Sequence, residues 1–325
     1  MTVNKIACAS EFSAHQLQGR VTADGSSGFK AEPGRYHLYL AWSCPWAQRT
    51  GIVRALKGLH DVVSLSYVDD ERDDRGWVFG SRRGLDPVNG FSSLAQGYEA
   101  TSPGYEGPVS VPVLWDRVTR RIVSNDESLI VLDLDTQFEE WSDPRVRLYP
   151  PDLADAVFEL SADLEATLSG GAYEVAWTTT QVEYEVLRLR IIATLERMDA
   201  RLADRRYLFG SSITAADVWL WPTLARFDLL DNPLGKISER GLTGFPHLWR
   251  YARDLYQVPA FRDTTDFDAF RKDRSGIRKE GPVRIAVDPV DVNWDACTTA
   301  SSGREMVPMI DSAGGNPPGA LELGQ

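Results

Sequence analysis

One short segment constrains the fold more than any other part of the chain. Residues 41–49, AWSCPWAQR, place a cysteine and a proline between two kinds of predicted structure. Tyr36–Leu40 predicts a strand before this segment, and residues 62–68 predict a second strand after it. Residues 45–59 predict a helix that starts with proline, whose missing N–H costs nothing in a first turn. We therefore expect a β-α-β unit with Cys44 at the amino end of its helix.

The next part of the chain predicts a second pair of strands. Residues 69–107 form a long irregular stretch, and residues 109–115 and 121–123 then predict a hairpin, followed by a helix that starts near Asp126. A proline inside a strand removes a ladder hydrogen bond, so the position of Pro112 within a predicted strand requires an explanation. We expect a cis Val111–Pro112 peptide at a strand end that faces a ligand.

From about residue 150 the pattern turns helical. Apolar residues recur every three to four positions within 182–202, and Thr214 and Asp217 have the spacing of a capping box at a further helix start. With 325 residues the chain suits two domains. We expect the following divisions: an N-terminal extension at 1–34, an α/β domain at 35–145, an all-helical domain at 150–285 and a disordered tail at 296–325.

Composition excludes several function classes. Forty-seven acidic against thirty-five basic residues give a formal charge of −12, which disfavours nucleic acid or an anionic membrane as a partner. No apolar run is long enough to span a bilayer, and the N-terminus lacks a secretory pattern. The three cysteines, Cys8, Cys44 and Cys297, do not make a disulfide framework, which favours a cytoplasmic protein. Without CxxC or HExxH motifs we expect no metal site.

The placement of Cys44 predicts thiol chemistry. Unpaired N–H groups and the positive end of a helix dipole favour a thiolate there, and Arg49 is expected to add positive charge. Ala47 stands where a CxxC motif has its second cysteine, so an oxidised Cys44 must form a mixed disulfide with a small thiol. The alternative is that Cys44 is a buried apolar residue that only packs.

These residues carry a family resemblance that extends from about residue 28 to 261. Its segments are GFKAEPGRYHLYLAWSCPWAQRT, DDRGWVF, VSVPVLWD, IVSN, WTTTQ, RYLFGSSITAADVWLW, ARFD and FPHLWRYARDLYQVPAF. The chain resembles the thioredoxin-fold glutathione transferases, and within them the Xi class, the glutathionyl-hydroquinone reductases. The resemblance implies a thioredoxin-like N-terminal domain, an all-α glutathione-transferase-like C-terminal domain, and a homodimer.

The resemblance also implies a mechanism and a set of site residues. The family's cysteine attacks the sulfur of a glutathionyl-quinol, releases the reduced aromatic, and is freed by a second glutathione; Cys44 stands at its position. Val111 would pair its backbone with the cysteinyl part of the thiol, as in strand addition. The positions implied to bind the thiol are Pro45, Trp46, Trp77, Val111, Pro112, Asp126, Glu127 and Ser128.

Glu127 departs from the family pattern. The family reads Asn-Glu-Ser-Ser where this chain reads Asn-Asp-Glu-Ser, so Asp126 takes the acid position and Glu127 takes that of a serine. In relatives that serine, with the helix N-terminus, meets a carboxylate of glutathione. Either Glu127 turns away and Ser128 substitutes, or the thiol lacks that carboxylate, as mycothiol does. A third interpretation is harmless drift, since acids suit a helix N-terminus.

The substrate side departs as well. Residues 229–233 replace a Val-Tyr pair, and residues 270–273 lack an expected tyrosine, so Tyr173 is the phenol that remains to meet an aromatic substrate. Arg271, with Lys272 and Arg274, offers positive charge for an anionic substrate, although each could be a surface charge. The missing phenols weaken the expectation of hydroquinone reduction relative to that of thiol chemistry.

Three functions remain open. The leading interpretation is a thiol-dependent reductase in which Cys44 cleaves S-conjugates of hydroquinone-like aromatics. The second is a transferase in which a bound thiol itself attacks an electrophile. The third is a non-enzymatic module that binds a thiol ligand, which the intact strand-Cys-Pro-helix segment disfavours.

Overall fold

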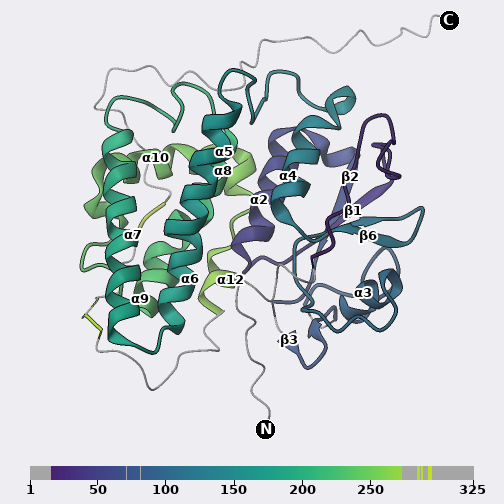
Figure 1. Cartoon of the computed structure of the whole chain (residues 1–325), viewed down its shortest axis with the longest axis horizontal. Coiled ribbons are helices and arrows are strands. Elements are labelled where there is room, and N and C mark those ends of the chain that lie inside the picture. The colour runs from purple at the N-terminus through teal and green to yellow at the C-terminus, as the bar shows by residue number, and fades with distance from the viewer. Residues whose placement is uncertain are drawn as a thin grey trace, which may run out of the picture.

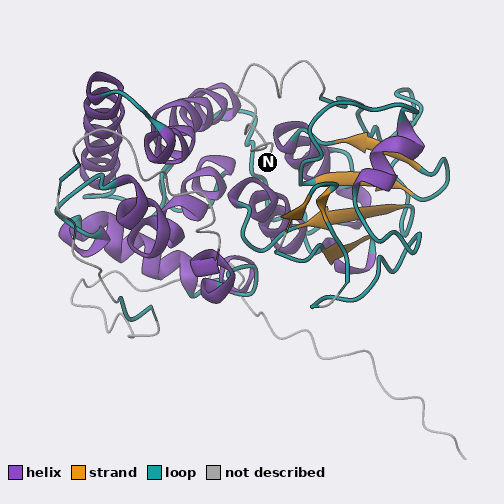
Figure 2. Ribbon diagram, turned by 90° about the horizontal axis from the view of Figure 1, so that it is seen from below, coloured by secondary structure: helices purple, strands orange, loops and turns teal. Residues whose placement is uncertain are grey.

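Two domains lie side by side in the computed structural model (Figure 1). The structure describes residues 16–70, 72–80 and 82–272, together with residues 284, 285, 287 and 292–294. The first domain holds the sheet, and the second, after about residue 150, is entirely helical (Figure 2). The predicted α/β and all-α classes are therefore confirmed.

A mixed four-stranded sheet forms the centre of the first domain. Its order is β2 (Val63–Tyr67), β1 (Tyr36–Leu40), β5 (Val113–Asp116) and β6 (Arg121–Ser124). β1 runs parallel to β2, as the β-α-β prediction requires, whereas β5 and β6 are antiparallel to their neighbours. All five residues of β1 are buried, because helices and loops cover both faces of this central strand.

Three helices accompany the sheet. α2 (Pro45–Leu56) and α4 (Glu127–Thr136) pack against each other, and α3 (Ala95–Thr101) lies against β6. α2 ends three residues before the predicted end, because Gly58 adopts a left-handed backbone (φ 69°) and residues 59–61 form a separate 3₁₀ turn. α3 lies within the stretch predicted to be irregular.

The first residues that the structure describes pack onto this sheet. The Gly19 N–H donates to Val123 O at 2.9 Å, and the Asn125 N–H donates to Leu17 O at 3.0 Å. Val21 is fully buried. This part of the predicted extension therefore pairs with the edge strand β6. The predicted tail at 296–325 lies outside the described residues.

The helical domain surrounds one buried helix, α8 (Ala215–Arg226). All twelve of its residues are buried. Asp217 accepts hydrogen bonds from the Thr214 N–H at 2.8 Å and the Leu208 N–H at 3.0 Å, so the predicted capping box is present. The other helical elements are α5 (Ala154–Leu164), the π-helical turn η3 (Glu165–Ser169), α6 (Gly170–Trp177), α7 (Gln181–Arg201), the π-helical turn η4 (Phe227–Asp231), α9 (Asn232–Gly235), α10 (Pro246–Tyr256), α11 (Pro259–Arg262) and α12 (Phe267–Lys272).

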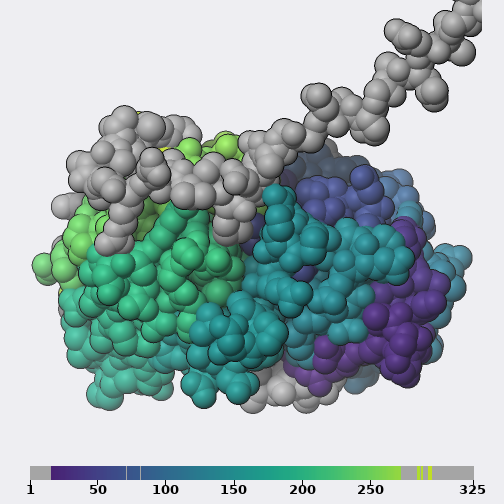
Figure 3. Space-filling model, turned by 90° about the horizontal axis from the view of Figure 1, so that it is seen from above, coloured from purple at the N-terminus to yellow at the C-terminus, as the bar shows by residue number. Residues whose placement is uncertain are grey.

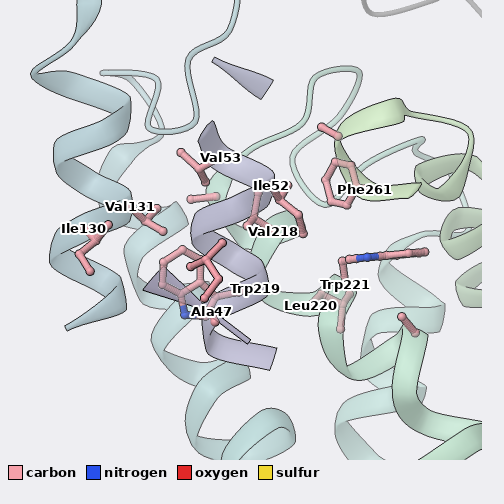
Figure 4. Close-up of a cluster of buried hydrophobic side chains, with 14 of the residues drawn as sticks. Ala47, Ile52, Val53, Ile130, Val131, Val218, Trp219, Leu220, Trp221 and Phe261 are labelled. Atoms are coloured by element: carbon pink, nitrogen blue, oxygen red, sulfur yellow. The ribbon is translucent and has the colours of Figure 1, made fainter. Parts of the chain in front are cut away.

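The domains meet along α2. This helix packs against α4 of its own domain and against α8 of the helical domain. Apolar side chains of the three helices form one cluster, with Ala47 and Ile52 of α2 beside Val218 and Trp219 of α8 (Figure 4). In a space-filling view the two domains are in contact across the face shown (Figure 3). The amino end of α2, with Cys44, therefore lies at the domain junction.

No helix among the described residues combines the length and apolar character needed to cross a bilayer.

Candidate active site at the amino end of α2

Cys44 is the N-cap residue of α2. Its backbone is extended (φ −83°, ψ 118°), and Pro45 takes the first helical position, as predicted. The sulfur accepts a hydrogen bond from the Ala47 N–H at 3.4 Å, and the thiol donates to Val111 O at 3.6 Å. The Val111–Pro112 peptide is cis, as predicted. The fold thus brings together two motifs that lie 67 residues apart in the sequence.

The ionisation of Cys44 differs from the expectation of a ready thiolate. Burial raises the pKa of the thiol above its ordinary value. The Ala47 N–H, the charge of Arg226 and the Trp46 N–H lower that pKa, but burial is the largest effect. In this structure the helix N-terminus therefore reduces the cost of ionising a buried sulfur without making the thiolate the favoured form.

Arg49 does not supply the charge that the sequence suggested. Its guanidinium is fully buried and bridges two carboxylates, with Nη1 3.3 Å from Glu127 Oε1 and Nη2 2.7 Å from Glu165 Oε2. It also donates to Ser169 Oγ at 3.0 Å and lies 5.1 Å from the ring centre of Trp219. Since two carboxylates already compensate this cation, it is a structural link between the domains.

The cation that acts on Cys44 is Arg226, which sequence reasoning missed. Arg226 is the last residue of α8, is 2% exposed, and donates to the carbonyls of Trp42 at 3.2 Å and Ser43 at 3.4 Å. It also donates to Gln48 Oε1, and Phe270 covers it at 3.7 Å from the ring centre. Arg226 therefore fastens the loop before Cys44 to the helical domain. The only signal in the sequence was its place in the ARFD segment.

Glu127 turns toward Arg49 from the first position of α4. The pKa of Glu127 is raised to about 7: burial is the largest cause, Arg49 opposes the shift, and the carboxylates of Glu165 and Asp126 add to it. The cluster of Arg49, Glu127 and Glu165 holds two carboxylates and one guanidinium, so it carries one excess negative charge when fully ionised. Protonation of Glu127 near neutral pH removes that excess charge.

The N–H groups at the start of α4 already have an acceptor. Asp126 is the N-cap residue, and its Oδ1 accepts from the Ser128 N–H at 3.0 Å and the Leu129 N–H at 3.3 Å. Its Oδ2 accepts from Gln18 Nε2 at 3.0 Å. Ser128 is exposed at the helix start. A ligand carboxylate at this position would therefore compete with Asp126 for the helix N–H groups.

Trp77 lies in a two-residue hairpin beside the cis-proline segment. The hairpin consists of β3 (Arg72–Asp73) and β4 (Gly76–Trp77), and the Arg72 guanidinium lies 4.4 Å from the Trp77 ring centre. A β-carbon at Gly76 would lie 3.1 Å from Cβ of Val109, so the hairpin packs closely on this segment. Within the described residues the Val111 N–H has no hydrogen-bond partner.

Trp46 joins Cys44 to the helical domain. Its Nε1 donates to Glu165 Oε1 at 2.9 Å, and its ring packs edge-on against Tyr173 with the ring centres 5.8 Å apart. Tyr173 is 40% exposed. The structure therefore brings the predicted phenol next to the residue that follows Pro45, on the same side of the domain junction. Glu165, which orients Trp46, was not anticipated from the sequence.

Arg271 belongs to a different environment. Its guanidinium lies 3.7 Å from Asp268 Oδ1 and is half exposed. With Leu229, Phe267 and Trp294 it lines a small pocket of about 170 Å³. The preceding residue, Phe270, is the one that faces Arg226. The side chains of Lys272 and Arg274 lie outside the described residues.

Comparisons with known proteins agree with this geometry. Residues 43–137 match the family model for the glutathione S-transferase N-terminal domain, and residues 181–254 match that for the C-terminal domain. The glutathionyl-hydroquinone reductase YqjG of Escherichia coli is 36% identical over 268 residues, which cover 80% of this chain and 82% of the relative.

Solved structures give the same result. A Xi-class glutathione transferase from Natrialba magadii superposes with a TM-score of 0.81 and 33% identity, covering 87% of this chain and 90% of that one. The glutathione-bound YqjG of Escherichia coli K-12 gives a TM-score of 0.76 and 35% identity, with 78% and 86% covered. With its cysteine, cis-proline and helical domain in this arrangement, the chain belongs to the glutathione S-transferase family and groups with its Xi class.

Proposed function

We propose that this protein is a thiol-dependent reductase that cleaves S-conjugates of hydroquinone-like aromatics, with Cys44 as the nucleophile. The observation that carries the proposal is the position of Cys44 at the start of α2, where its sulfur lies 3.6 Å from the carbonyl of Val111 before the cis-proline. A relative with this activity in its name covers four-fifths of the chain.

The proposed reaction has two steps. The Cys44 thiolate attacks the sulfur of the conjugate, which forms an S–S bond and breaks the carbon–sulfur bond. The electron pair of that bond goes to the aromatic carbon, which takes up a proton and leaves as the reduced hydroquinone. A free thiol then attacks the mixed disulfide, releases the disulfide of the two small thiols, and restores Cys44. Each turnover consumes one conjugate and one free thiol, because the other half of the released disulfide comes from the conjugate.

Ionisation of Cys44 is the demanding requirement of the first step. Because burial raises the pKa of this thiol, only a minor fraction is thiolate at neutral pH. The Ala47 N–H and the Arg226 charge then stabilise the thiolate that does form. We therefore expect turnover to rise with pH through the alkaline range.

We propose that the thiol lies along the cis-proline segment. The N–H of Val111, which has no hydrogen-bond partner among the residues that the structure describes, can together with the Val111 carbonyl pair with an extended peptide as an added strand. Trp77 flanks this segment, and Pro112, Pro45 and Trp46 complete the surroundings of the sulfur. Asp126, Glu127 and Ser128 form the end of the site at the start of α4.

We propose glutathione as the thiol, with mycothiol as the alternative. The support for glutathione is that Glu127 turns toward Arg49, which keeps its carboxylate paired with a cation. Titration calorimetry with both thiols tests this choice. Glutathione should bind more tightly, and Glu127→Ser should tighten glutathione several-fold, since it removes a nearby like charge, while leaving mycothiol almost unchanged. Tighter binding of mycothiol by the unmodified protein would reverse the assignment.

Tyr173 is proposed to meet the aromatic part of the substrate. Its ring packs on Trp46, next to Pro45 and Cys44, and is 40% exposed at the domain junction. A phenol there can donate a hydrogen bond to a phenolate oxygen as charge develops. Arg271 is the less favoured contact, because it lines a pocket that includes neither Cys44 nor Trp46.

The decisive experiment is Cys44→Ser with a glutathionyl-hydroquinone substrate. We expect turnover to fall by a factor of about 10³ or more, because a serine hydroxyl cannot form the disulfide intermediate. Cys8→Ser and Cys297→Ser are matched controls that should keep full activity. Mass spectrometry of unmodified protein after one substrate addition should find a thiol adduct on Cys44. Full turnover by Cys44→Ser would rule out this mechanism.

One observation favours a second candidate, conjugation of a thiol to an electrophile. A neutral thiol can donate a hydrogen bond to the sulfur of a bound thiolate, and the raised pKa of Cys44 suits that role. Under this mechanism Cys44→Ser would keep conjugating activity toward a chloroaromatic electrophile.

We further propose that the protein acts in the cytoplasm and as a homodimer. The cytoplasmic assignment rests on Cys44, which is a free thiol in the structure and must stay reduced to react. The dimer rests on the family resemblance.

A further inference from the structure

Asp231 carries a carboxyl group that the proposed mechanism leaves unused. It ends the π-helical turn η4, directly after α8, and it is half-buried. Among the residues that the structure describes, its carboxyl makes no hydrogen bond or ion pair. Asp228 of the same turn accepts from the Leu242 N–H at 2.9 and 3.1 Å, so that carboxyl has a structural partner. Asp231 has none and is available to a ligand.

The π-helical turn directs Asp231 to the same side as Arg226. In such a turn the backbone hydrogen bonds join residues five apart, so Arg226 and Asp231 lie one above the other on one face. In an α-helix the same spacing would point the two side chains apart. Arg226 reaches the carbonyls of Trp42 and Ser43, directly before Cys44. Asp231 therefore faces the loop that carries the sulfur.

Asp231 and Cys44 share one cation. The Arg226 guanidinium lowers the pKa of both groups, so it lies close enough to act on both charges. Phe270 covers that guanidinium from α12, which packs on η4 and lies on the side of the helical domain nearest the first domain (Figure 1). Tyr173 comes from α6, which also packs on η4. Asp231, Tyr173 and Cys44 therefore lie around the same part of the domain junction.

Asp231 retains a proton near neutral pH. Its pKa is raised to about 7: burial is the cause of the shift, and the charge of Arg226 opposes it. A carboxylic acid with such a pKa can give up its proton during a reaction, whereas an ordinary aspartate has already lost it. An aromatic ring bound beside the carboxyl shields it further from water and raises the pKa again. The acid form therefore persists in the substrate complex at a pH where Cys44 begins to ionise.

We propose that Asp231 is the catalytic acid of the cleavage step and delivers a proton to the aromatic carbon as the bond from that carbon to sulfur breaks. The inference rests on the proposed function, because that reaction needs one proton at this carbon. The Cys44 thiolate forms the S–S bond, and the electron pair of the broken bond takes the Asp231 proton to form a C–H bond. Asp231 is left as a carboxylate and recovers a proton from solvent, which the attacking thiol of the second step replaces. Tyr173 acts on a different atom, the phenolate oxygen.

Two reactions of Cys44 separate this role from a structural one. Cleavage of a glutathionyl-hydroquinone needs a proton on carbon. Exchange with the mixed disulfide of glutathione and thionitrobenzoate needs none, because only S–S bonds change and the leaving thiolate is stable. Asp231→Asn should lower kcat for cleavage by about 100-fold or more, while the rate of exchange should change by less than about twofold. Asp231→Glu keeps a carboxyl group and should recover part of the cleavage.

Asp263→Asn is the matched control and should leave both reactions unchanged, since Asp263 is 64% exposed and pairs with Arg262 on the surface. Unchanged cleavage by Asp231→Asn, or an equal loss of both reactions, would overturn the acid role. A change in KM alone would also overturn it, because Asp231 would then serve only in binding. Cleavage by Cys44→Ser would overturn the proposed function together with the acid role, whereas a fully active Asp231→Asn beside an inactive Cys44→Ser would overturn the acid role alone.

Discussion

At Cys44 two electrostatic effects oppose each other. Burial disfavours the thiolate, while the Ala47 N–H at 3.4 Å and the Arg226 charge favour it. The sequence made the contribution of the helix N–H groups visible, because a cysteine before a helix can be recognised from its neighbours, but it did not show that of Arg226. The first effect depends on how deeply the surrounding loops cover the sulfur, and it decides the direction of the pKa shift.

The first prediction concerns the reactivity of this sulfur. In a variant that carries Cys8→Ser and Cys297→Ser, the rate of alkylation by iodoacetamide should rise with pH to an apparent pKa above about 8.5, the ordinary thiol value. The reason is that burial raises the pKa of Cys44 in the ligand-free protein. An apparent pKa below 7 would mean that the helix N-terminus and Arg226 outweigh burial.

A second residue-scale prediction concerns Glu127. Its pKa is raised from 4.5 to about 7, so the folded protein binds more protons than the unfolded chain between these values. The contribution of Glu127 to the free energy of unfolding therefore falls as the pH rises through that window. Glu127→Gln removes the titration and should be more stable than the unmodified protein by about 1 kcal/mol or more at pH 8.

Urea unfolding of both proteins at pH 5 and pH 8 measures the effect. Asp228 and Asp231 also have raised pKa values, but they are common to both proteins, so their effect cancels in the difference. If the difference in unfolding free energy is the same at both pH values, Glu127 does not titrate as the structure indicates.

At the scale of single elements, the start of α8 depends on one carboxylate. Asp217 is fully buried and accepts from the Leu208 N–H, the Thr214 N–H and the Tyr251 hydroxyl at 2.8 to 3.0 Å. The start of α7 depends instead on the exposed Thr180, whose hydroxyl accepts from the Glu183 N–H at 3.3 Å. Both residues help to cap a helix, Asp217 as a carboxylate at the third helical position and Thr180 as an N-cap hydroxyl, and they differ in burial.

The third prediction compares these caps. Asp217→Ala should lower the free energy of unfolding by about 3 kcal/mol or more, because it leaves several buried hydrogen-bond donors without an acceptor. Thr180→Ala should cost about 1 kcal/mol, the ordinary value of an exposed N-cap. Chemical denaturation of both variants gives the comparison, and equal losses would show that burial does not add to the value of the cap.

The elements also differ in how well the sequence predicts them. The strand at β1 and the start of α2 follow from alternation and an N-terminal proline. α3 was missed because it has seven residues, too few to show a helical period, and no side-chain N-cap. β5 begins at Val113, four residues after the predicted start, because Pro112 has no N–H to donate to the ladder.

At the scale of the whole molecule, two buried arginines hold the domains together. Arg49 of the first domain reaches Glu165 and Ser169 of the helical domain, and Arg226 of the helical domain reaches the carbonyls of Trp42 and Ser43. The two contacts lie on either side of Cys44 in the sequence. Movement of one domain against the other would therefore change the surroundings of the sulfur.

The fourth prediction is that Arg49→Met destabilises the protein by about 2 to 4 kcal/mol, because it leaves two partly buried carboxylates without their cation. Arg145→Met is the control, since Arg145 pairs with Asp143 on the surface and is 54% exposed, and it should cost less than about 1 kcal/mol. Thermal or urea unfolding measures both. A loss below 1 kcal/mol for Arg49→Met would show that the link between the domains is not structural.

The sequence by itself determined the β-α-β unit, the cysteine at the helix start, the cis Val111–Pro112 peptide and the capping box of α8. Each of these follows from residues close together in the chain, where periodicity, proline and capping act. Only the tertiary structure decided that Arg226 and not Arg49 faces Cys44, and that Glu165 orients Trp46. Those partners lie more than a hundred residues apart in the sequence, so their contacts exist only once the two domains have packed.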